Sequence, residues 1–294
     1  MRYILLILCS ILLSKKIEPF KLDSSKIKFK GFSKKLDLSV VPTNNADNIL
    51  TDSYLEKHDI EALKIIAKNY QAEPVDEDDV VILEPTRGTM KLKLFHNIAP
   101  NHCNNFKKLA NSGFYDETSF HRIIKGFMIQ GGDINTRDSD IYNDGQGDPG
   151  WQINEEFNDI KHKKGILSMA RGSNVNSAGS QFFICSADAS WLDGQYTAFG
   201  KVIENDYTIN LLENTETERT SILRSCFDKI PKEEDAKNWI KVIDRRNNRI
   251  LYSKIPEDYT SASYTSHVNS QLNNDRPIAA PKIIKVRVVD SNDE

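Results

Sequence analysis

The sequence predicts a mainly β fold with few helices, and two observations carry this prediction. Residues 80–83 and 90–94 are short apolar segments joined through Arg87 and Gly88, which is the pattern of a β-hairpin. Residues 282–289 alternate in the way that is typical of a half-buried strand. With 294 residues, 39% of them hydrophobic, the chain can form one sizeable core with further segments around it.

Three other segments have the apolar spacing of amphipathic helices, namely 51–70, 100–112 and 207–212. The stripe shared in the first segment is Leu63, Ile66, Ala67 and Tyr70. In the second segment, the inward face is Cys103, Phe106, Leu109 and Ala110. Pro100 opens this second helix and Gly113 ends it. In the third, Ile209 and Leu212 share a face.

Charge and residue counts exclude several classes of function. Lysine and arginine number 39 against 42 acidic residues, a formal net charge of −3, so no global footprint for nucleic acid is present. The cysteines and histidines form no ligand cluster or disulfide framework, and we expect Cys103 and Cys185 to be buried thiols. The acidic loop 138–150 fails as a calcium loop, because Tyr142 and Trp151 would fill positions that require oxygen ligands. No metal and no cofactor are expected.

The first residues have the form of an export signal. An apolar run at 4–13 precedes Lys15 and Lys16 and is too short to span a bilayer comfortably. A buried N-terminal strand is the alternative, and no small-x-small cleavage site follows the run. We expect a signal peptide at 1–14 and no stable membrane span in the mature chain. The lysine-rich residues 15–48 are expected to form an unstructured tether, the alternative being a basic face for anionic lipid or a partner.

The stretch 119–133 contains two extended segments that are separated by Gly126. Strand alternation predicts one face with the side chains of Phe120, Arg122 and Ile124. The opposite face would carry His121 and Ile123. Such an arrangement could form an apolar floor with a cationic fork beside it. Alternation alone is also the ordinary pattern of a half-buried strand, so its role stays open at this point.

Four later segments read GILSMAR (165–171), GSNVNSAG (172–179), SQFFIC (180–185) and WLDGQYTAFGKV (191–202). Together with 120–133 they closely resemble the cyclophilin family of peptidyl-prolyl isomerases, over about residues 80–207. The loop 170–179 is similar to the version found in bacterial members. The resemblance implies a closed eight-stranded antiparallel barrel capped by two α-helices, here with an N-terminal helical extension.

The resemblance also implies a division of the chain into parts. An N-terminal extension is expected at 15–78 and a cyclophilin-like isomerase domain at 79–290. Because cyclophilin barrels finish with a strand, 282–289 is expected to close the barrel, and 217–274 to be an insertion before closure. Within the insertion, 239–242 and 250–252 predict a hairpin, and the Ser/Thr-rich residues 259–270 predict a loop.

The site residues follow from the same resemblance. Arg122 falls on the catalytic arginine of the family. The walls of the proline pocket are expected to be Phe127, Met128, Phe183 and Leu192. The polar positions that hold the arginine or the peptide backbone are Gln130 and Gln181. The main-chain substrate contacts are expected at Ala170 and Arg171. Trp191 matches the rim tryptophan that favours cyclosporin binding, and Tyr196 stands where many eukaryotic cyclophilins have histidine.

The resemblance implies a peptidyl-prolyl cis-trans isomerase that assists the folding of exported or envelope proteins, in the periplasm, in the cell envelope or after secretion. Proline-containing polypeptides and cyclosporin are the expected ligands, without a nucleic-acid partner. Two alternatives remain open: a proline-peptide binding module without essential turnover, and a chaperone scaffold whose insertion or N-terminal helix docks a larger assembly. Retention of Arg122 together with the apolar set favours the enzyme over the binding module.

Overall fold

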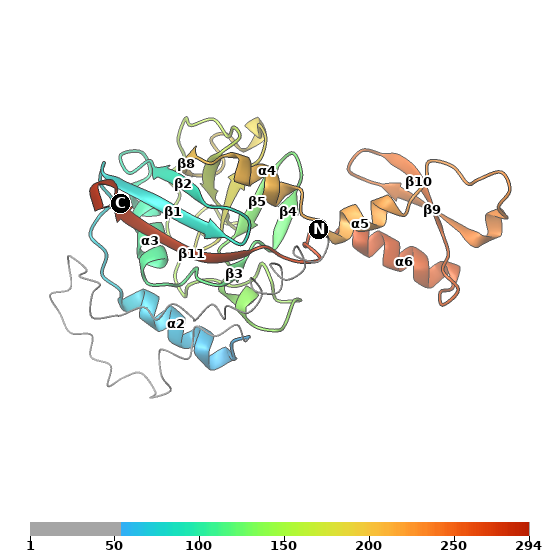
Figure 1. Ribbon diagram of the computed structural model, residues 1–294, viewed down its shortest axis with the longest axis horizontal. Helices are drawn as coiled ribbons and strands as arrows, with labels where there is room; N and C mark the ends of the chain where they lie inside the picture. The colour runs from blue at the N-terminus through green and yellow to red at the C-terminus, as the bar shows by residue number, and fades with distance from the viewer. Residues whose placement is uncertain (1–53, 294) are drawn as a thin grey trace, which may run out of the picture. The chain divides into compact units, whose positions relative to one another are not determined.

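The computed structural model describes residues 54–293, and its main element is a nine-stranded antiparallel sheet (Figure 1). The order of neighbouring strands is β3-β11-β1-β2-β8-β6-β7-β5-β4. The strands are β1 (Asp79–Pro85), β2 (Met90–Leu94), β3 (Thr118–Ser119), β4 (Arg122–Ile124), β5 (Met128–Gly131), β6 (Ile166–Met169), β7 (Phe182–Cys185), β8 (Ala198–Glu204) and β11 (Lys282–Asp290). The fold is mainly β, as predicted. The predicted signal at 1–14 and tether at 15–48 lie outside the described residues.

Two of the strand predictions are confirmed directly. β1 and β2 pair as an antiparallel hairpin, with Val81 opposite Leu92. β11 pairs along the other side of β1, from Asp79 opposite Asp290 to Pro85 opposite Ile283. Figure 1 shows the red β11 beside the blue-green β1. The last strand therefore lies inside the sheet, between β1 and β3, and is not an edge strand.

The two ends of the strand order are β3 and β4, which are separated in the chain by Phe120 and His121 alone. Ser119 of β3 forms an isolated bridge with Asp133, just after β5, so the sheet curls until its ends approach each other. The sequence predicts eight strands, whereas this sheet has nine, because residues 118–124 form two short strands. Among the described residues no ladder joins β3 to β4, so closure by a continuous ladder stays a prediction.

Residues 275–281, which precede β11, account for the division of residues 118–124 into two short strands. The Phe120 amide donates to the Pro281 carbonyl at 2.9 Å, and the Ile123 amide donates to the Asp275 carbonyl at 3.0 Å. The predicted face shared by Phe120 and Arg122 is wrong. Phe120 is fully buried in the main core, whereas the Arg122 side chain is 46% exposed. Regular alternation fails here because the chain leaves the strand conformation between 119 and 122.

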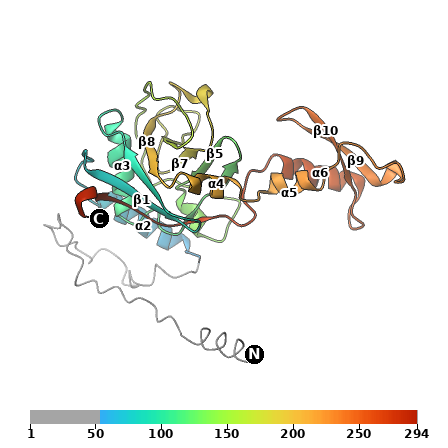
Figure 2. The ribbon, with the colours of Figure 1, turned by 45° about the horizontal axis from the view of Figure 1, so that its top comes forward.

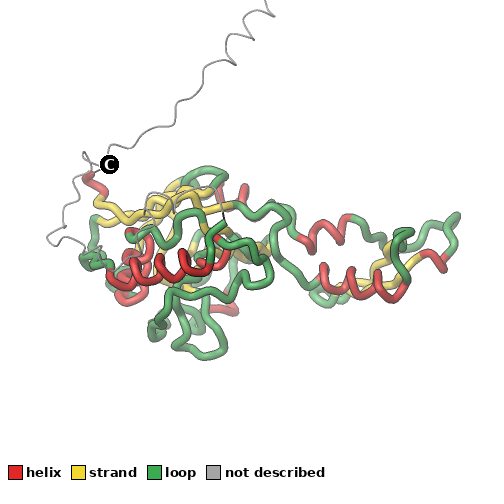
Figure 3. The backbone as a smooth tube through the Cα atoms, turned by 90° about the horizontal axis from the view of Figure 1, so that it is seen from below, coloured by secondary structure: helices red, strands yellow, loops and turns green. Residues whose placement is uncertain are grey.

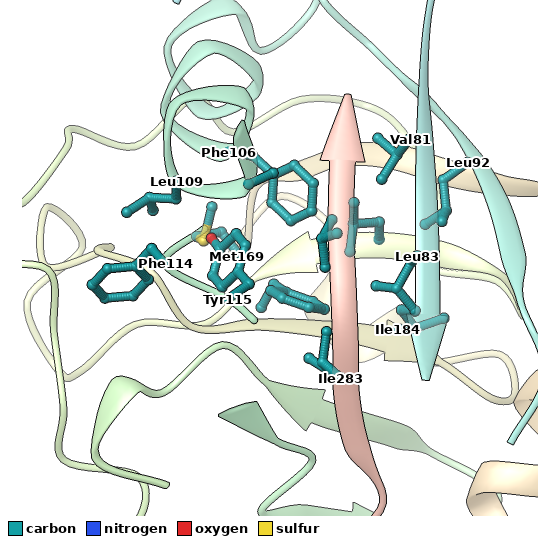
Figure 4. Packing of buried hydrophobic residues seen from close by; sticks show 14 of the residues in the cluster. Val81, Leu83, Leu92, Phe106, Leu109, Phe114, Tyr115, Met169, Ile184 and Ile283 are labelled. Atoms are coloured by element: carbon teal, nitrogen blue, oxygen red, sulfur yellow. The ribbon is translucent and has the colours of Figure 1, made fainter. Parts of the chain in front are cut away.

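One face of the sheet forms the main core. Directly paired residues along the β4-β5-β7-β6 ladders point to this side, namely Ile123, Ile129, Ile184 and Leu167. The helix α3 (Pro100–Asn111) covers it with the predicted face Cys103, Phe106, Leu109 and Ala110, all buried. Figure 4 shows Phe106 and Leu109 of α3 in one cluster with Val81 and Leu83 of β1 and Ile283 of β11. The Phe106 ring lies 5.3–5.5 Å from those of Tyr115, Phe182 and Phe199. Burial of such rings is the largest source of stability for this core.

The other two predicted helices are also present. α4 (Tyr207–Glu213) buries Ile209 and Leu212 in the main core. α2 (Lys57–Asn69) buries Ile60, Leu63 and Ala67. It begins later than predicted, because the Leu55 amide donates to the Arg137 carbonyl at 2.8 Å and a capping box at Glu56 opens the helix. No helix among residues 54–293 is long and apolar enough to cross a membrane.

Residues 217–276, which we call the lobe, lie between α4 and β11 in the chain. The lobe contains α5 (Glu218–Arg224), α6 (Ser261–Leu272) and a separate two-stranded sheet of β9 (Trp239–Asp244) and β10 (Arg249–Lys254). Figures 2 and 3 show both helices beside this hairpin. The buried lobe core is Ile240, Val242, Leu251, Tyr264, Val268 and Leu272.

The hairpin of the lobe confirms the sequence prediction, but the predicted loop at 259–270 is wrong. This segment is α6, whose buried residues Tyr264, Val268 and Leu272 recur at helical spacing. Thr260 caps the helix through a box with Ser263. The hydroxyl residues thus begin the helix and lie on its exposed side, where their low helix propensity is tolerated.

Candidate active site

The second face of the sheet carries most of the predicted site residues. Arg122 of β4 lies opposite Gln130 of β5, Gln130 lies opposite Phe183 of β7, and Phe183 lies opposite Ser168 of β6. Two residues further along, Ile124, Met128 and Cys185 form the next row. Because side chains alternate along each strand, these rows face away from the main core. The ladder therefore places a guanidinium, an amide and apolar groups side by side.

A second apolar cluster, which we call the outer cluster, lies on this face. Its buried members are Met128, Ile166, Phe183, Cys185, Ala189, Leu192 and Ala198. Phe127, Ala170 and Tyr196 are among the half-buried residues packed against it. Phe183 meets Tyr196 edge to face at 6.0 Å between ring centroids. Trp191, 58% exposed, lies 5.3 Å from Phe127. The five apolar residues predicted for the proline site and its rim are thus brought together.

The polar residues Arg122, Gln130 and Gln181 form a chain of hydrogen bonds beside this cluster. Arg122 Nη1 donates to Gln130 Oε1 at 3.4 Å, and Gln130 Nε2 donates to Gln181 Oε1 at 3.0 Å. Gln181 Nε2 in turn donates to the carbonyls of Gly145 and Gly147, at 3.0 and 2.9 Å. The two predicted glutamines therefore link the arginine to the loop 138–150.

The backbone of that acidic loop is fixed by hydrogen bonds to the side chain of Asp133. The Gly145 and Gly147 amides donate to Asp133 Oδ2 at 2.5 and 3.1 Å. A Cβ at Gly147 would lie 1.9 Å from Asp133 Oδ1, so only glycine allows the backbone to approach this carboxylate. The fully buried Asp133 thereby holds the loop whose carbonyls orient Gln181.

Ala170 and Arg171 lie at another part of the outer cluster. The Ala170 amide donates to the Gln181 carbonyl at 2.9 Å, which holds the end of β6 beside Gln181. The Arg171 guanidinium lies over the Tyr196 ring, 4.6 Å from its centroid, and donates to the Gln195 carbonyl at 3.0 Å. A cation over an aromatic face stabilises both groups. The structure thus pairs Tyr196 with Arg171 of the loop 170–179.

A Ser–His–Asp arrangement with a buried serine and histidine lies beside the outer cluster and was not predicted. His162 Nδ1 lies 3.1 Å from Asp193 Oδ1, and His162 Nε2 lies 2.9 Å from Ser168 Oγ. Burial lowers the pKa of His162 more than Asp193 raises it. The spacing is that of a hydrolytic triad. Ser168, however, is fully buried, so a substrate cannot reach its hydroxyl. The imidazole stacks on Phe183 at 6.3 Å and supports the outer cluster.

Sequence reasoning also missed a carboxylate beside the arginine. Asp275 Oδ2 lies 3.6 Å from Arg122 Nε, and the Asp275 side chain is only 6% exposed. Asp275 is far from Arg122 in the chain and belongs to none of the recognised motifs. The single local signal was Arg276-Pro277, which marks a turn before the last strand but says nothing about a contact with Arg122.

Comparisons with known proteins agree with this geometry. The family model "Cyclophilin type peptidyl-prolyl cis-trans isomerase/CLD" matches residues 80–234. A peptidyl-prolyl cis-trans isomerase of Synechococcus elongatus is 44% identical over 133 residues, which cover 45% of this chain and 86% of the relative. The peptidyl-prolyl cis-trans isomerase-like 1 of Neurospora crassa is 49% identical over 130 residues, covering 42% of this chain and 73% of the relative.

Among solved structures, a cyclophilin-type isomerase of Cryptosporidium parvum, crystallised in the presence of the dipeptide Ala-Pro, aligns with a TM-score of 0.49. It is 28% identical, and the alignment covers 71% of this chain and 98% of that chain.

The family match and the relatives define the class of this protein as a prolyl isomerase. The chain belongs to the cyclophilin-type peptidyl-prolyl cis-trans isomerase family.

Proposed function

We propose that the outer cluster binds the proline ring of a polypeptide and that Arg122 is the catalytic residue for isomerisation. The peptide bond resists rotation with a barrier of about 18–20 kcal/mol because it has partial double-bond character. A catalyst must therefore stabilise the twisted amide more than either planar form. Twisting removes conjugation and leaves a lone pair on the prolyl nitrogen, which a guanidinium N–H can meet with a hydrogen bond. This reaction needs neither a nucleophile nor a metal.

The magnitude of this bond limits what Arg122 alone can supply. A charge-assisted hydrogen bond contributes about 1.5–3 kcal/mol net, and a tenfold gain in rate needs about 1.4 kcal/mol. One arginine thus accounts for roughly one to two decades of rate. The remaining acceleration is assigned to the buried surfaces of Met128, Phe183 and Leu192, which would hold the ring and exclude water.

One observation supports this proposal above the others. The Arg122 side chain is 46% exposed, tethered by Gln130, and lies on the same sheet face as the outer cluster. A structural arginine of a core would instead be buried and fully paired. The accessible guanidinium also favours an enzyme over a module that only binds proline peptides, since binding alone needs the apolar surface but no donor for the twisted amide.

The test is turnover of a proline tetrapeptide by the Arg122→Ala variant. Because the bond forms chiefly at the twisted amide, we expect kcat to fall at least tenfold while peptide affinity stays within about threefold. Arg122→Lys should recover little, since an ammonium lacks the planar fork. Arg249→Ala, which removes an exposed arginine of the lobe, is the matched control and should keep full turnover. Unchanged turnover in Arg122→Ala would contradict the proposed role.

Cyclosporin is the second proposed ligand of this site. The exposed ring of Trp191, packed against Phe127, offers an indole N–H and an apolar edge at the rim of the cluster. We expect cyclosporin to compete with the peptide and to change tryptophan fluorescence. Trp191→Phe leaves Trp151 and Trp239 in place, so loss of the signal in this variant would assign it to the rim. An active enzyme without a saturable change would contradict the proposal.

We further propose that the clients are exported or envelope proteins. The support is the apolar run at 4–13 with basic residues on both sides, a composition typical of an export signal. Fusion of residues 1–48 to a reporter protein, followed by cell fractionation, tests this proposal. A reporter that stays in the cytoplasm would contradict export and would leave the isomerase assignment unaffected.

A further inference from the structure

Asp275 lies where the lobe returns to the sheet, and its backbone is fixed there. Its carbonyl accepts the Ile123 amide at 3.0 Å, so residue 275 is bonded to the middle of β4, one residue beyond Arg122. The residues on both sides of it pair with the other end of the lobe. The Arg219 amide donates to the Asn274 carbonyl at 3.0 Å, and the Glu218 amide donates to the Arg276 carbonyl at 3.0 Å. The position of the Asp275 side chain is therefore determined by both the sheet and the lobe.

The carboxylate of Asp275 lies between two guanidinium groups. Arg246 Nη2 approaches Oδ1 at 2.7 Å and Oδ2 at 2.8 Å, while Arg122 Nε lies 3.6 Å from Oδ2. Arg246 belongs to the turn between β9 and β10, and its amide donates to Asp244 Oδ1 at 3.1 Å. Asp244 in turn binds Arg219 through two contacts of 2.7 Å. A continuous series of charged contacts thus runs from the lobe to the arginine of the candidate active site.

The geometry at Arg122 separates the two edges of its guanidinium. Asp275 lies on the Nε edge, and Gln130 accepts from Nη1 at a long 3.4 Å. The carboxylate is buried, so it holds its place, whereas the arginine is half exposed and has a long side chain with many rotamers. An anion at Nε restricts these rotamers and leaves N–H groups of the two terminal nitrogens for the substrate. Preorganisation of this kind lowers the entropy that must be lost at the transition state.

We propose that Asp275 is a positioning residue that holds the Arg122 guanidinium toward the proline site, with Arg246 of the lobe fixing the carboxylate. The inference rests on the proposed catalytic role of Arg122. The lobe is accordingly part of the active site's support, and the identity of residue 275 sets how well the arginine is aligned.

The test is a double-mutant cycle in the full chain, measured as kcat and KM on a proline tetrapeptide. Asp275→Asn keeps the size of the side chain and removes its charge, and we expect kcat to fall three- to tenfold with KM within twofold. Asp275→Glu should recover at least half of this loss on a logarithmic scale. In the Arg122→Ala background, Asp275→Asn should change kcat by less than 1.5-fold, because the group that it positions is absent.

Two controls separate positioning from a general effect on the fold. Asp228→Asn removes an exposed carboxylate of the lobe that pairs with Arg249, and should leave kcat unchanged. Arg246→Gln removes the arginine that fixes the carboxylate while Asp275 remains, and should lower kcat by less than Asp275→Asn does. Wild-type or higher kcat in Asp275→Asn would overturn the inference, as would an equal loss from Asp275→Asn in the Arg122→Ala background. Wild-type kcat in Arg122→Ala would instead overturn the proposed function, so the two failures are distinguishable.

Discussion

The lobe differs in its stabilisation from the nine-stranded sheet and the helices α3 and α4 that pack on that sheet. The sheet buries one large apolar cluster whose centre is a set of touching aromatic rings. The lobe has a smaller apolar cluster of six buried side chains, where α6 packs on the two-stranded sheet. The lobe also contains ion pairs of low exposure, with Arg219 paired to Asp244 and Arg276 paired to Glu218. A large apolar core thus characterises the first region, and a small apolar core with little-exposed ion pairs characterises the second.

The comparison teaches that the two regions should fail under different perturbations. Truncating apolar groups or strands should unfold the sheet, whereas removing one charged partner should open the lobe alone. The four changes below test this contrast, from the largest expected effect to the smallest.

Deletion of residues 282–290 should abolish the folded sheet. It removes β11 from the interior of the strand order, with the ladder to β1, the pairing with β3 and the buried side chains of Ile283, Val286 and Val288. Bare strand edges would remain on both sides and favour aggregation. We expect no cooperative thermal transition and no turnover. A stable, active deletion variant would refute the placement of β11 as an essential inner strand.

Arg219→Met should open the lobe and spare the sheet. The change leaves the carboxylate of Asp244, 2% exposed, without its buried partner, which typically costs about 3–5 kcal/mol. We expect faster proteolysis within 217–276, while the main thermal transition stays and turnover remains within threefold. The exposed pair of Arg249 with Asp228 supplies the control, because Arg249→Met should cost about 0–1 kcal/mol. Equal protease resistance in both variants would contradict the contrast.

Replacement of residues 220–273 by a short Gly/Ser linker should leave an active isomerase. The replaced segment contributes no residue to the outer cluster, and the backbone pairs that join 216–219 to 274–278 are kept. Closing a longer loop costs only about 0.6 kcal/mol for each doubling of its length. We expect the main transition to shift by a few degrees and kcat to stay within threefold, since Asp275 is retained. A linker variant that does not fold would show that the sheet depends on the lobe.

Asp144→Asn should have the smallest effect, and one that depends on pH. Burial and the neighbouring Asp133 and Asp138 raise the pKa of Asp144 to about 6. The folded state therefore binds this proton more tightly than the unfolded chain. The contribution of Asp144 to the free energy of unfolding is fully present below the unfolded pKa of about 3.9. This contribution is lost as the pH rises through about 6. We expect the variant to be more stable than the wild type by about 1 kcal/mol at pH 7.5, after allowance for solvent screening, and equal at pH 4.

Urea unfolding at both pH values measures this difference, with Glu73→Gln as an exposed control.

The pH dependence of the lobe should be the opposite, because of Asp244. Burial alone would raise the pKa of that carboxyl, but the hydrogen bonds from Arg219 and from the Arg246 backbone outweigh burial and lower the pKa. Its contribution is present above the unfolded pKa and is lost as the pH falls through the folded value. Acid should therefore destabilise the lobe. At Asp144, by contrast, protonation removes the cost of burying the charge and the repulsion from Asp133 and Asp138.

Periodicity in the sequence was sufficient for the elements whose apolar spacing is regular. It predicted α3 through Cys103, Phe106 and Leu109, and β11 through its alternation. It failed for α6, because serine and threonine dominate the composition and the stripe of Tyr264, Val268 and Leu272 is sparse. Composition describes the exposed side of such a helix, whereas the buried side determines whether it forms.

The candidate site likewise contains residues that the sequence predicted and residues that it did not. Contiguous motifs made it possible to name Arg122, the two glutamines and part of the outer cluster, including Met128, Phe183 and Leu192, and the structure brings these residues together. Asp275 could not be named, because its contact with Arg122 depends on how the chain returns from the lobe. Long-range pairing of this kind has no local pattern. The buried network of His162, Asp193 and Ser168 was missed for the same reason.

The place of β11 in the sheet also has a consequence for biosynthesis. β11 pairs with β1 and follows it in the chain by about two hundred residues, so the sheet cannot complete its strand order until the intervening segment and β11 itself have been synthesised. The lobe, whose contacts are local in sequence, can form before that moment. Because the contacts of β1 with β11 are so distant in sequence, closing the sheet should be a slow step in folding. A nascent chain stalled before residue 282 would expose an unpaired β1 edge, and would be the form of this isomerase that itself most needs a chaperone.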